Sequence, residues 1–151
     1  MNVKLRPPTD NDWAGILQVA NQSAPWALAE NPEWLRNRQQ FDERRYPRRQ
    51  YLAEDLNTQQ IVGYGAIEGG DTAHKYRVYV VTRPELLREL GGKIYQRLAA
   101  DLTQLQTALA WAREEAGDPL VAFFLERDFR ETQRFTLPNG REAVVLERQW
   151  R

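Results

Sequence analysis

Residues 81–98 read VTRPELLRELGGKIYQRL, and this stretch decides the fold. It begins at the end of an alternating apolar run, passes a glycine pair, Gly91 and Gly92, and ends in apolar residues at helical spacing. The pattern predicts a strand, a loop and then a helix. Backbone amides in a loop ahead of a helix N-terminus bind anions, because they are unpaired and lie at the positive end of the helix dipole. The stretch therefore predicts a site of the kind that holds a pyrophosphate.

The size and charge of the chain limit what such a site belongs to. The 151 residues fit one domain, residues 1–151, that buries a core of its own. Basic and acidic residues number 21 each, so no overall field attracts nucleic acid or an anionic membrane. The sequence has no run approaching the roughly 20 apolar residues of a membrane span and no apolar signal-peptide core. Cysteine is absent, which excludes disulfides and zinc-thiolate sites. We expect a cytoplasmic protein with no metal, no nucleic-acid partner and no membrane partner.

The first third of the chain has the pattern of one strand and two helices. Alternation over residues 3–5 predicts a short strand, and Thr9, followed by acidic residues, is typical of a helix N-cap. The pair Asn31 and Pro32 predicts the start of a second helix, which we expect to run to about Arg45.

The middle of the chain changes to strands. Residues 50–55, 61–68 and 75–81 are apolar runs separated by polar turns, which predicts an antiparallel meander. Apolar residues then recur at helical spacing over residues 94–105. Alternation over residues 107–114 predicts a further strand, parallel to the one before the helix, because such crossovers are right-handed.

The last third of the chain has signals for a short helix and a hairpin. Asp118 and Pro119 have the form of a helix cap and first turn, and Asn139-Gly140 is a strong hairpin signal. The predicted fold class is α+β in three layers: a mixed, mostly antiparallel sheet of six or seven strands with about four helices.

This element order and three local patterns resemble the GCN5-related N-acetyltransferase (GNAT) family. The segment YLAEDLNTQQIVGYGAIE is similar to the family's second and third strands. The segment VTRPELLRELGGKIYQRL is similar to its fourth strand, acyl-CoA loop and third helix, and PLVAFFLERDF to the block before the last hairpin. The resemblance covers nearly the whole chain.

The resemblance implies transfer of an acetyl or acyl group from acetyl-CoA, as co-substrate, to a small-molecule or peptide amine. It assigns main-chain contacts with the pantetheine arm to Val80 and Val81, with room beside the alanines of residues 107–114. It assigns the lining of the pyrophosphate site to six residues, namely Arg88, Glu89, Leu90, Gly91, Gly92 and Lys93.

Two departures from the family pattern affect this expectation. In one alignment, Leu86 and Glu89 stand where the family loop usually has glutamine or arginine and the first glycine. An alignment one or two residues later puts Arg88 and Gly91 on the first two fixed positions but leaves Lys93 at the third. Phe124 stands where many members have the tyrosine that protonates the departing thiolate. We expect that proton to come from Tyr95, from Tyr79 or from water, or else the thiolate to leave unprotonated. Packing is the alternative role of both tyrosines.

The amine must lose a proton before it attacks, so the site needs a base. The candidates are Glu68, at the end of the third strand, and His74, whose ordinary pKa of about 6.5 suits the task. Glu114 and Asp71 are further acids at strand ends or turns, and a solvated strand end is the alternative reading of each. Trp26 is the candidate for acceptor binding, since the family forms its acceptor lip between the first two helices.

Three alternatives remain open at this stage. The chain is alternatively a catalytically inactive GNAT-like domain that binds acyl-CoA or a protein partner. The arginines of residues 36–49 either bind an acidic partner or form a salt-bridged surface, because acidic residues are interspersed among them. Trp150 either belongs to a homodimer edge or anchors the end of the chain.

Overall fold

The computed structural model describes residues 1–23 and 32–151 and contains a seven-stranded sheet in the order β1-β2-β3-β4-β5-β7-β6. Its strands are β1 (Val3–Arg6), β2 (Arg48–Asp55), β3 (Gln60–Gly69), β4 (Lys75–Thr82), β5 (Leu109–Glu115), β6 (Arg130–Thr136) and β7 (Glu142–Gln149). Its main helices are α1 (Trp13–Ser23), α2 (Pro32–Gln39), α3 (Gly92–Gln104) and α4 (Pro119–Leu125). The predicted fold class and element order are confirmed.

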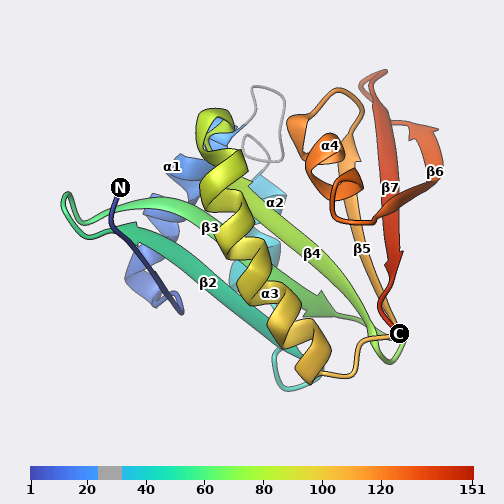
Figure 1. Ribbon diagram of the computed structural model, residues 1–151, viewed down its shortest axis with the longest axis horizontal. Helices are drawn as coiled ribbons and strands as arrows, with labels where there is room; N and C mark the ends of the chain where they lie inside the picture. Colours follow the sequence, from blue (N-terminus) through green and yellow to red (C-terminus); the bar gives the residue numbers. More distant parts are fainter. Residues whose placement is uncertain (24–31) are drawn as a thin grey trace.

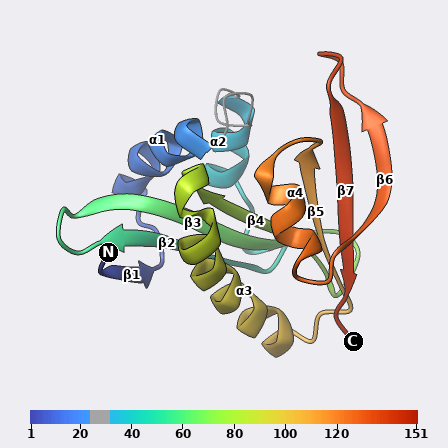
Figure 2. The ribbon, with the colours of Figure 1, turned by 45° about the horizontal axis from the view of Figure 1, so that its top comes forward.

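The sheet is antiparallel except at one place. Strands β2 to β4 form the predicted meander and β1 pairs antiparallel with β2, while β4 and β5 are parallel and are joined through α3. Helices α1 and α2 cover one face of the sheet, and α3 covers the other (Figures 1 and 2). Helix α4 lies beside β5 on the α3 face, and β6 and β7 form an outer hairpin. The result is three layers with the sheet in the middle.

Each face of the sheet has its own core, as period-2 alternation in the strands requires. On the α3 face, Val78 and Val80 of β4 pack in one cluster with Ile94 and Leu98 of α3. On the other face, Tyr79 packs in a second cluster together with side chains of α1, α2, β2 and β3, namely Trp13, Ile16, Ala20, Trp34, Leu52, Tyr64 and Ala66. Trp34 is therefore a core residue.

Helix α3 lies unusually close to the sheet because β3 presents glycines to it. A Cβ atom at Gly65 would overlap the side chain of Ile94 and would lie 3.2 Å from Leu98 Cδ1. Both neighbours are fully buried, so neither side chain has free space to move into. The glycine thus sets the distance between the helix and the sheet.

The variant Gly65→Ala is expected to lower the free energy of unfolding by about 1–3 kcal/mol, because overpacking a filled core forces side chains off their rotamers. Gly70→Ala is the matched control, since no atom lies within 4 Å of a Cβ there. Urea denaturation measures both variants. A loss of stability in Gly70→Ala as large as in Gly65→Ala contradicts the packing argument.

The second helix is shorter than its sequence suggested. It ends at Gln39, whereas we expected it to continue to about Arg45. Asp42 explains the difference, because its carboxylate accepts the amide of Arg44 and its carbonyl accepts the amides of Arg45 and Tyr46. An aspartate that binds nearby amides in this way favours a turn over a helix.

The end of the chain is anchored on α3. The indole of Trp150 donates to Thr103 Oγ1 at 3.0 Å, and its amide donates to the carbonyl of Ala108. Arg148 lies over the Trp150 ring, 4.2 Å from its centroid. These contacts favour the anchoring role of Trp150. In the described part of the chain, no helix is both long and apolar enough to cross a membrane.

Candidate functional site

The two parallel strands of the sheet separate after a short region of pairing. Strands β4 and β5 pair only at Lys75–Leu109, Tyr76–Ala110 and Arg77–Trp111, and then diverge (Figure 1). Beyond these pairs, the facing edges of the two strands have no strand partner in the described residues. A strand edge of this kind offers free N–H and C=O groups to a ligand that lies along it.

Val80 and Val81, the residues expected to contact pantetheine, lie on this open part of β4. Both pair with β3 on their other side, at Gly65 and Tyr64. The structure thus brings the predicted contact region to the edge of the split. The alanines of β5 do not provide the extra room that we expected. Ala110 and Ala112 are fully buried in the core cluster that contains Phe123 and Phe124.

The glycine pair is not a loop, which corrects the sequence-based expectation. A 3₁₀ turn at Pro84–Leu86 and a π turn at Leu87–Gly91 lead directly into α3. The helical run starts early because Pro84 is well suited to a first helical position. The amides of Leu86 and Gly92 donate to the carbonyls of Arg83 and Glu89 within these turns.

The two glycines have a packing role instead. A Cβ atom at Gly91 would lie 2.8 Å from Leu87 Cδ1 and 3.3 Å from Phe123 Cε2. One at Gly92 would lie 3.3 Å from Arg127 Nη2. The pair therefore lets the start of α3 approach α4 closely. Leu90 is buried as well, with its side chain beside Gly63 of β3.

The charged residues of the same segment face solvent. Arg88, Glu89 and Lys93 are all exposed, so the Glu89 carboxylate does not occupy the interior of the predicted anion site. In a π turn the hydrogen bonds join residues five apart, so the first amides of the turn have no partner within it. The amide of Leu87, the first of the turn, donates instead to the carbonyl of Pro84. Arg88 and Glu89 follow it on the same turn, which packs against β4.

Tyr95 is held in a cluster of aromatic rings between α3 and α4. Its ring centroid lies 6.1, 6.5 and 6.2 Å from those of Phe123, Phe124 and Phe129. Its hydroxyl accepts a hydrogen bond from Arg148 Nη1 at 2.9 Å. Burial raises the pKa of Tyr95 above its ordinary value, so the hydroxyl keeps its proton at neutral pH. Tyr95 thus places a phenol beside the phenylalanine that replaces the expected tyrosine.

Glu68 is engaged in a buried ion-pair network. Arg38 of α2 donates to it from Nε and Nη2 at 2.8 Å each, and Arg48 Nη1 lies 3.5 Å away. Burial raises the pKa of Glu68, and the charges of the two arginines oppose that rise. Arg48 also pairs with Glu43, and Arg45 with Asp71. This geometry favours a structural role for Glu68 and the salt-bridged alternative for these arginines.

His74 lies at the wrong end of β4. It precedes the strand in a tight turn, with φ at 60°, and its carbonyl accepts the amides of Ala108 and Leu109. Seven residues of extended chain separate it from Val81, which corresponds to roughly 20 Å. His74 therefore does not reach the open edge of β4. Trp26, the candidate for acceptor binding, lies outside the described residues.

Glu114 is the acid that the structure brings to the split. It follows Trp111 and Ala112 on β5, beyond the last pair with β4, and is half-buried. Its loss of hydration and the charge of Asp118 raise its pKa to about 8, while Arg77 opposes the rise. An acid with a pKa near neutrality is a suitable general base. In the sequence, the one signal for Glu114 as a candidate base is its place on a mostly apolar strand.

In residues 1–23 and 32–151, no group of three or more histidine, cysteine, aspartate or glutamate side chains forms a candidate metal site.

The fold of the chain is similar to that of known acetyltransferase structures. An acetyltransferase assigned to the GNAT family, from Desulfovibrio desulfuricans, matches with a TM-score of 0.77 at 13% identity, over 99% of this chain and 100% of its own. The ribosomal-protein-S18-alanine N-acetyltransferase of Escherichia coli matches with a TM-score of 0.73 at 12% identity, over 98% and 94%. The chain has the GNAT fold.

A third structure with the GNAT fold contains the coenzyme. The PaiA N-acetyltransferase of Thermoplasma acidophilum, in complex with coenzyme A, matches with a TM-score of 0.67 at 12% identity, over 99% of each chain. No family model and no curated protein matches the sequence. At these identities the likeness establishes the GNAT fold, which agrees with the resemblance inferred from residues 81–98.

Proposed function

We propose that this chain transfers an acetyl group from acetyl-CoA to an amine. The observation that supports this most is the separation of β4 from β5 after Arg77, which leaves Val80 and Val81 on an open strand edge. The amide groups of the pantetheine arm match such an edge, because they hydrogen bond to it as a strand does. The GNAT-fold protein PaiA, in its complex with coenzyme A, supports the choice of ligand.

The diphosphate of the coenzyme would dock at the start of the π turn. Arg88 and Lys93 carry exposed positive charges on this segment. The helical run that begins at Pro84 continues through this turn into α3, and its dipole favours an anion near its first turns. This docking does not require the open loop that the sequence suggested.

Arg88→Glu is expected to weaken acetyl-CoA binding by about tenfold, because it reverses a charge beside a diphosphate. The loss should shrink as salt is raised, since exposed charges are screened. Arg49→Glu, at an exposed position on β2, is the control with the same charge change. Isothermal titration at two salt concentrations measures both. Equal affinities for the two variants contradict this placement of the diphosphate.

The reaction needs one proton acceptor and one proton donor. The amine nitrogen attacks the thioester carbonyl carbon, the new C–N bond forms, and the C–S bond then breaks to release the thiolate. Glu114 takes the proton from the amine, which its raised pKa suits. Tyr95 gives a proton to the thiolate, since its hydroxyl is protonated at neutral pH and Arg148 leaves its O–H free to donate.

A second candidate function is a GNAT-fold domain that binds acyl-CoA or a protein partner without transfer. Two observations favour it: Phe124 is fully buried and has no hydroxyl, and the glycine pair is packed inside helical turns. The presence of Glu114 on the unpaired part of β5, with its raised pKa, favours transfer.

We also propose that the protein is cytoplasmic, which the absence of cysteine supports, and that it forms a homodimer.

An assay of thiol release from acetyl-CoA across a panel of amines separates the two functions. Transfer predicts release that depends on the amine and yields the acetylated product by mass spectrometry. Binding of acetyl-CoA with no amine-dependent release in the whole panel selects the second function. If the chain does not bind acetyl-CoA at all, both acetyl transfer and acyl-CoA binding without transfer are rejected.

A further inference from the structure

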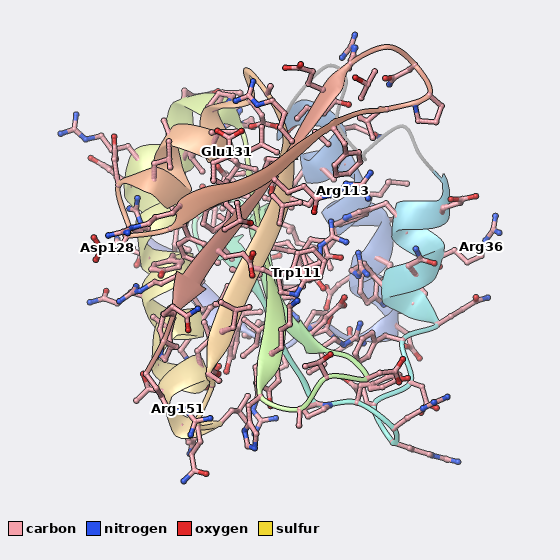
Figure 3. All side chains as sticks on the ribbon, turned by 90° about the vertical axis from the view of Figure 1, so that its right-hand side faces the viewer. Arg36, Trp111, Arg113, Asp128, Glu131 and Arg151 are labelled. Carbon is pink, nitrogen blue, oxygen red and sulfur yellow. The ribbon has the colours of Figure 1, made fainter. Side chains whose placement is uncertain are left out.

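A small pocket lies at the root of the split, on the face of the sheet covered by α2. It has a volume of about 270 Å³ and is lined by Phe41, Glu68, the turn of residues 69–72, and Lys75, Arg77 and Trp111. Figure 3 shows Trp111 and Arg113 projecting from β5 on this face, toward α2. The volume is near the lower end of the range for small-molecule sites.

Arg77 is the unusual member of this pocket. Its guanidinium lies 4.5 Å from the ring centroid of Tyr79 and 5.0 Å from that of Trp111. Its Nε is buried and has no hydrogen-bond partner in the described residues, and no carboxylate among them forms an ion pair with it. An arginine held between two rings keeps its fork of donors in a fixed plane. The group is oriented and lacks an anion.

The acidic residues of the pocket already have partners. Glu68 is paired with Arg38 and Arg48, and Asp71 accepts from Tyr46 and lies 3.6 Å from Arg45. Lys75, 5.9 Å from the Trp111 ring centroid, adds a second positive charge at the rim. The pocket therefore has an excess of positive charge next to an aromatic wall.

We propose that the acceptor is an α-amino acid, whose carboxylate is bound by Arg77 against Trp111 at the root of the split. This assignment rests on the proposed function and names the substrate class for it. A planar guanidinium matches a carboxylate through two parallel N–H···O bonds. A single negative charge suits the pocket better than a phosphate dianion, because the Glu68 and Asp71 carboxylates in the same wall repel the second charge.

The position of Arg77 places this pocket at the root of the split. Arg77 is the last residue of β4 that pairs with β5, and its charge acts on Glu114 across the opening of the split. The amine of an α-amino acid is one carbon away from its carboxylate. A carboxylate bound at Arg77 therefore places the amine at the root of the split, on the α2 face of the sheet. Glu114 lies three residues beyond Trp111 and, by the alternation of β5, projects from the other face, so the split is the route between them.

Titration calorimetry on the full chain, without acetyl-CoA, tests the assignment. The probes are glycine, L-phenylalanine and L-lysine, each compared with its α-amide, which keeps the amine and removes the negative charge. At least one acid should bind about 10- to 100-fold more tightly than its amide, the range expected for a hydrogen-bonded charged group. Aminomethylphosphonate, compared with glycine, reports on a phosphate-like anion.

Two variants test whether Arg77 is the source of the preference for the acid over its amide. Arg77→Met should remove the preference for the acid, and Arg77→Lys should restore part of it. Arg113→Gln is the control, since Arg113 lies on the same face of β5 but stacks on Phe135, outside the pocket, and should keep the preference. Circular dichroism and thermal melts show whether each variant is folded.

Each outcome either supports or overturns the amino-acid pocket. Equal affinity for acids and amides, no saturable heat with any acid, or a preference that survives in Arg77→Met overturns the assignment. Tighter binding of the phosphonate than of glycine overturns the choice of a carboxylate. Because acetyl-CoA is absent, a preserved acid preference in a chain that does not bind the coenzyme supports the amino-acid pocket and rejects only the transfer reaction.

Discussion

Glu114→Gln is expected to lower kcat for acetyl transfer by about 100- to 10,000-fold, the range by which a positioned general base accelerates a reaction. Glutamine keeps the size of the side chain but cannot accept the proton of the amine. The affinity for acetyl-CoA should not change, because the coenzyme is held by the edge of β4 and the turn at Arg88. Steady-state kinetics and calorimetry on the same preparation measure the two quantities.

The pH dependence gives this variant a second signature. The parent should lose kcat/KM as pH falls below about 8, because Glu114 becomes protonated there.

The raised pKa of Glu114 also makes stability depend on pH. The folded state binds the proton of Glu114 more tightly than the unfolded chain, in which the pKa of this side chain is about 4.5. The stability that it contributes is complete below pH 4.5 and is lost as pH rises through 8. Glu114→Gln should therefore melt higher than the parent above pH 5, by a margin that stops growing past pH 8.

Glu115→Gln is the neighbouring control, since that carboxylate pairs with Arg141 at 3.3 Å and its residue follows Glu114 directly on β5. It should keep both kcat and the pH profile. A Glu114→Gln enzyme with kcat within threefold of the parent, and the same acidic limb, shows that another group is the base.

Glu68→Gln is expected to lower the free energy of unfolding by about 3–5 kcal/mol, because it leaves the buried charges of Arg38 and Arg48 without a counter-ion. The side chains of Arg38 and Glu68 are only 8% and 5% exposed. For a chain of this length, the loss corresponds to a fall in Tm on the order of 10 °C. Thermal and urea denaturation at neutral pH measure it.

Glu43→Gln is the matched control because Glu43 pairs with the same Arg48 but is 57% exposed, so its removal should change stability little. The comparison also decides the role of Glu68. If Glu68→Gln keeps the stability of the parent but loses turnover, Glu68 is catalytic and the structural interpretation is wrong.

Local patterns were sufficient to predict most of the fold. Alternation over residues 75–81 and helical spacing from Ile94 to Leu102 each belong to one element, so they can be read without knowledge of the rest. The parallel crossover from β4 to β5 followed from the order strand, helix and strand in the sequence. The end of α2 could not be read this way, since the hydrogen bonds of Asp42 compete with an otherwise helical pattern.

The candidate site depended on contacts between distant residues, and the sequence does not display these. Gly91 and Gly92 fit equally well with an anion loop and with close helix packing, and only the position of Phe123 distinguishes the two. Glu68 looked like a free strand-end acid because its partners Arg38 and Arg48 are 30 and 20 residues away. The raised pKa of Glu114 comes from burial in the folded chain.

Isothermal titration of the chain with acetyl-CoA, and with free coenzyme A, tests the central claim most directly. The account predicts saturable binding at one site per chain and a rise in Tm with ligand concentration. At a ligand concentration of 100 times the dissociation constant, the added free energy of unfolding is about 2.7 kcal/mol. Arg88→Glu should weaken that binding and Glu114→Gln should leave it intact. An absence of heat and of any Tm shift with both ligands, in a folded protein, would contradict the assignment of the split between β4 and β5 as a coenzyme site.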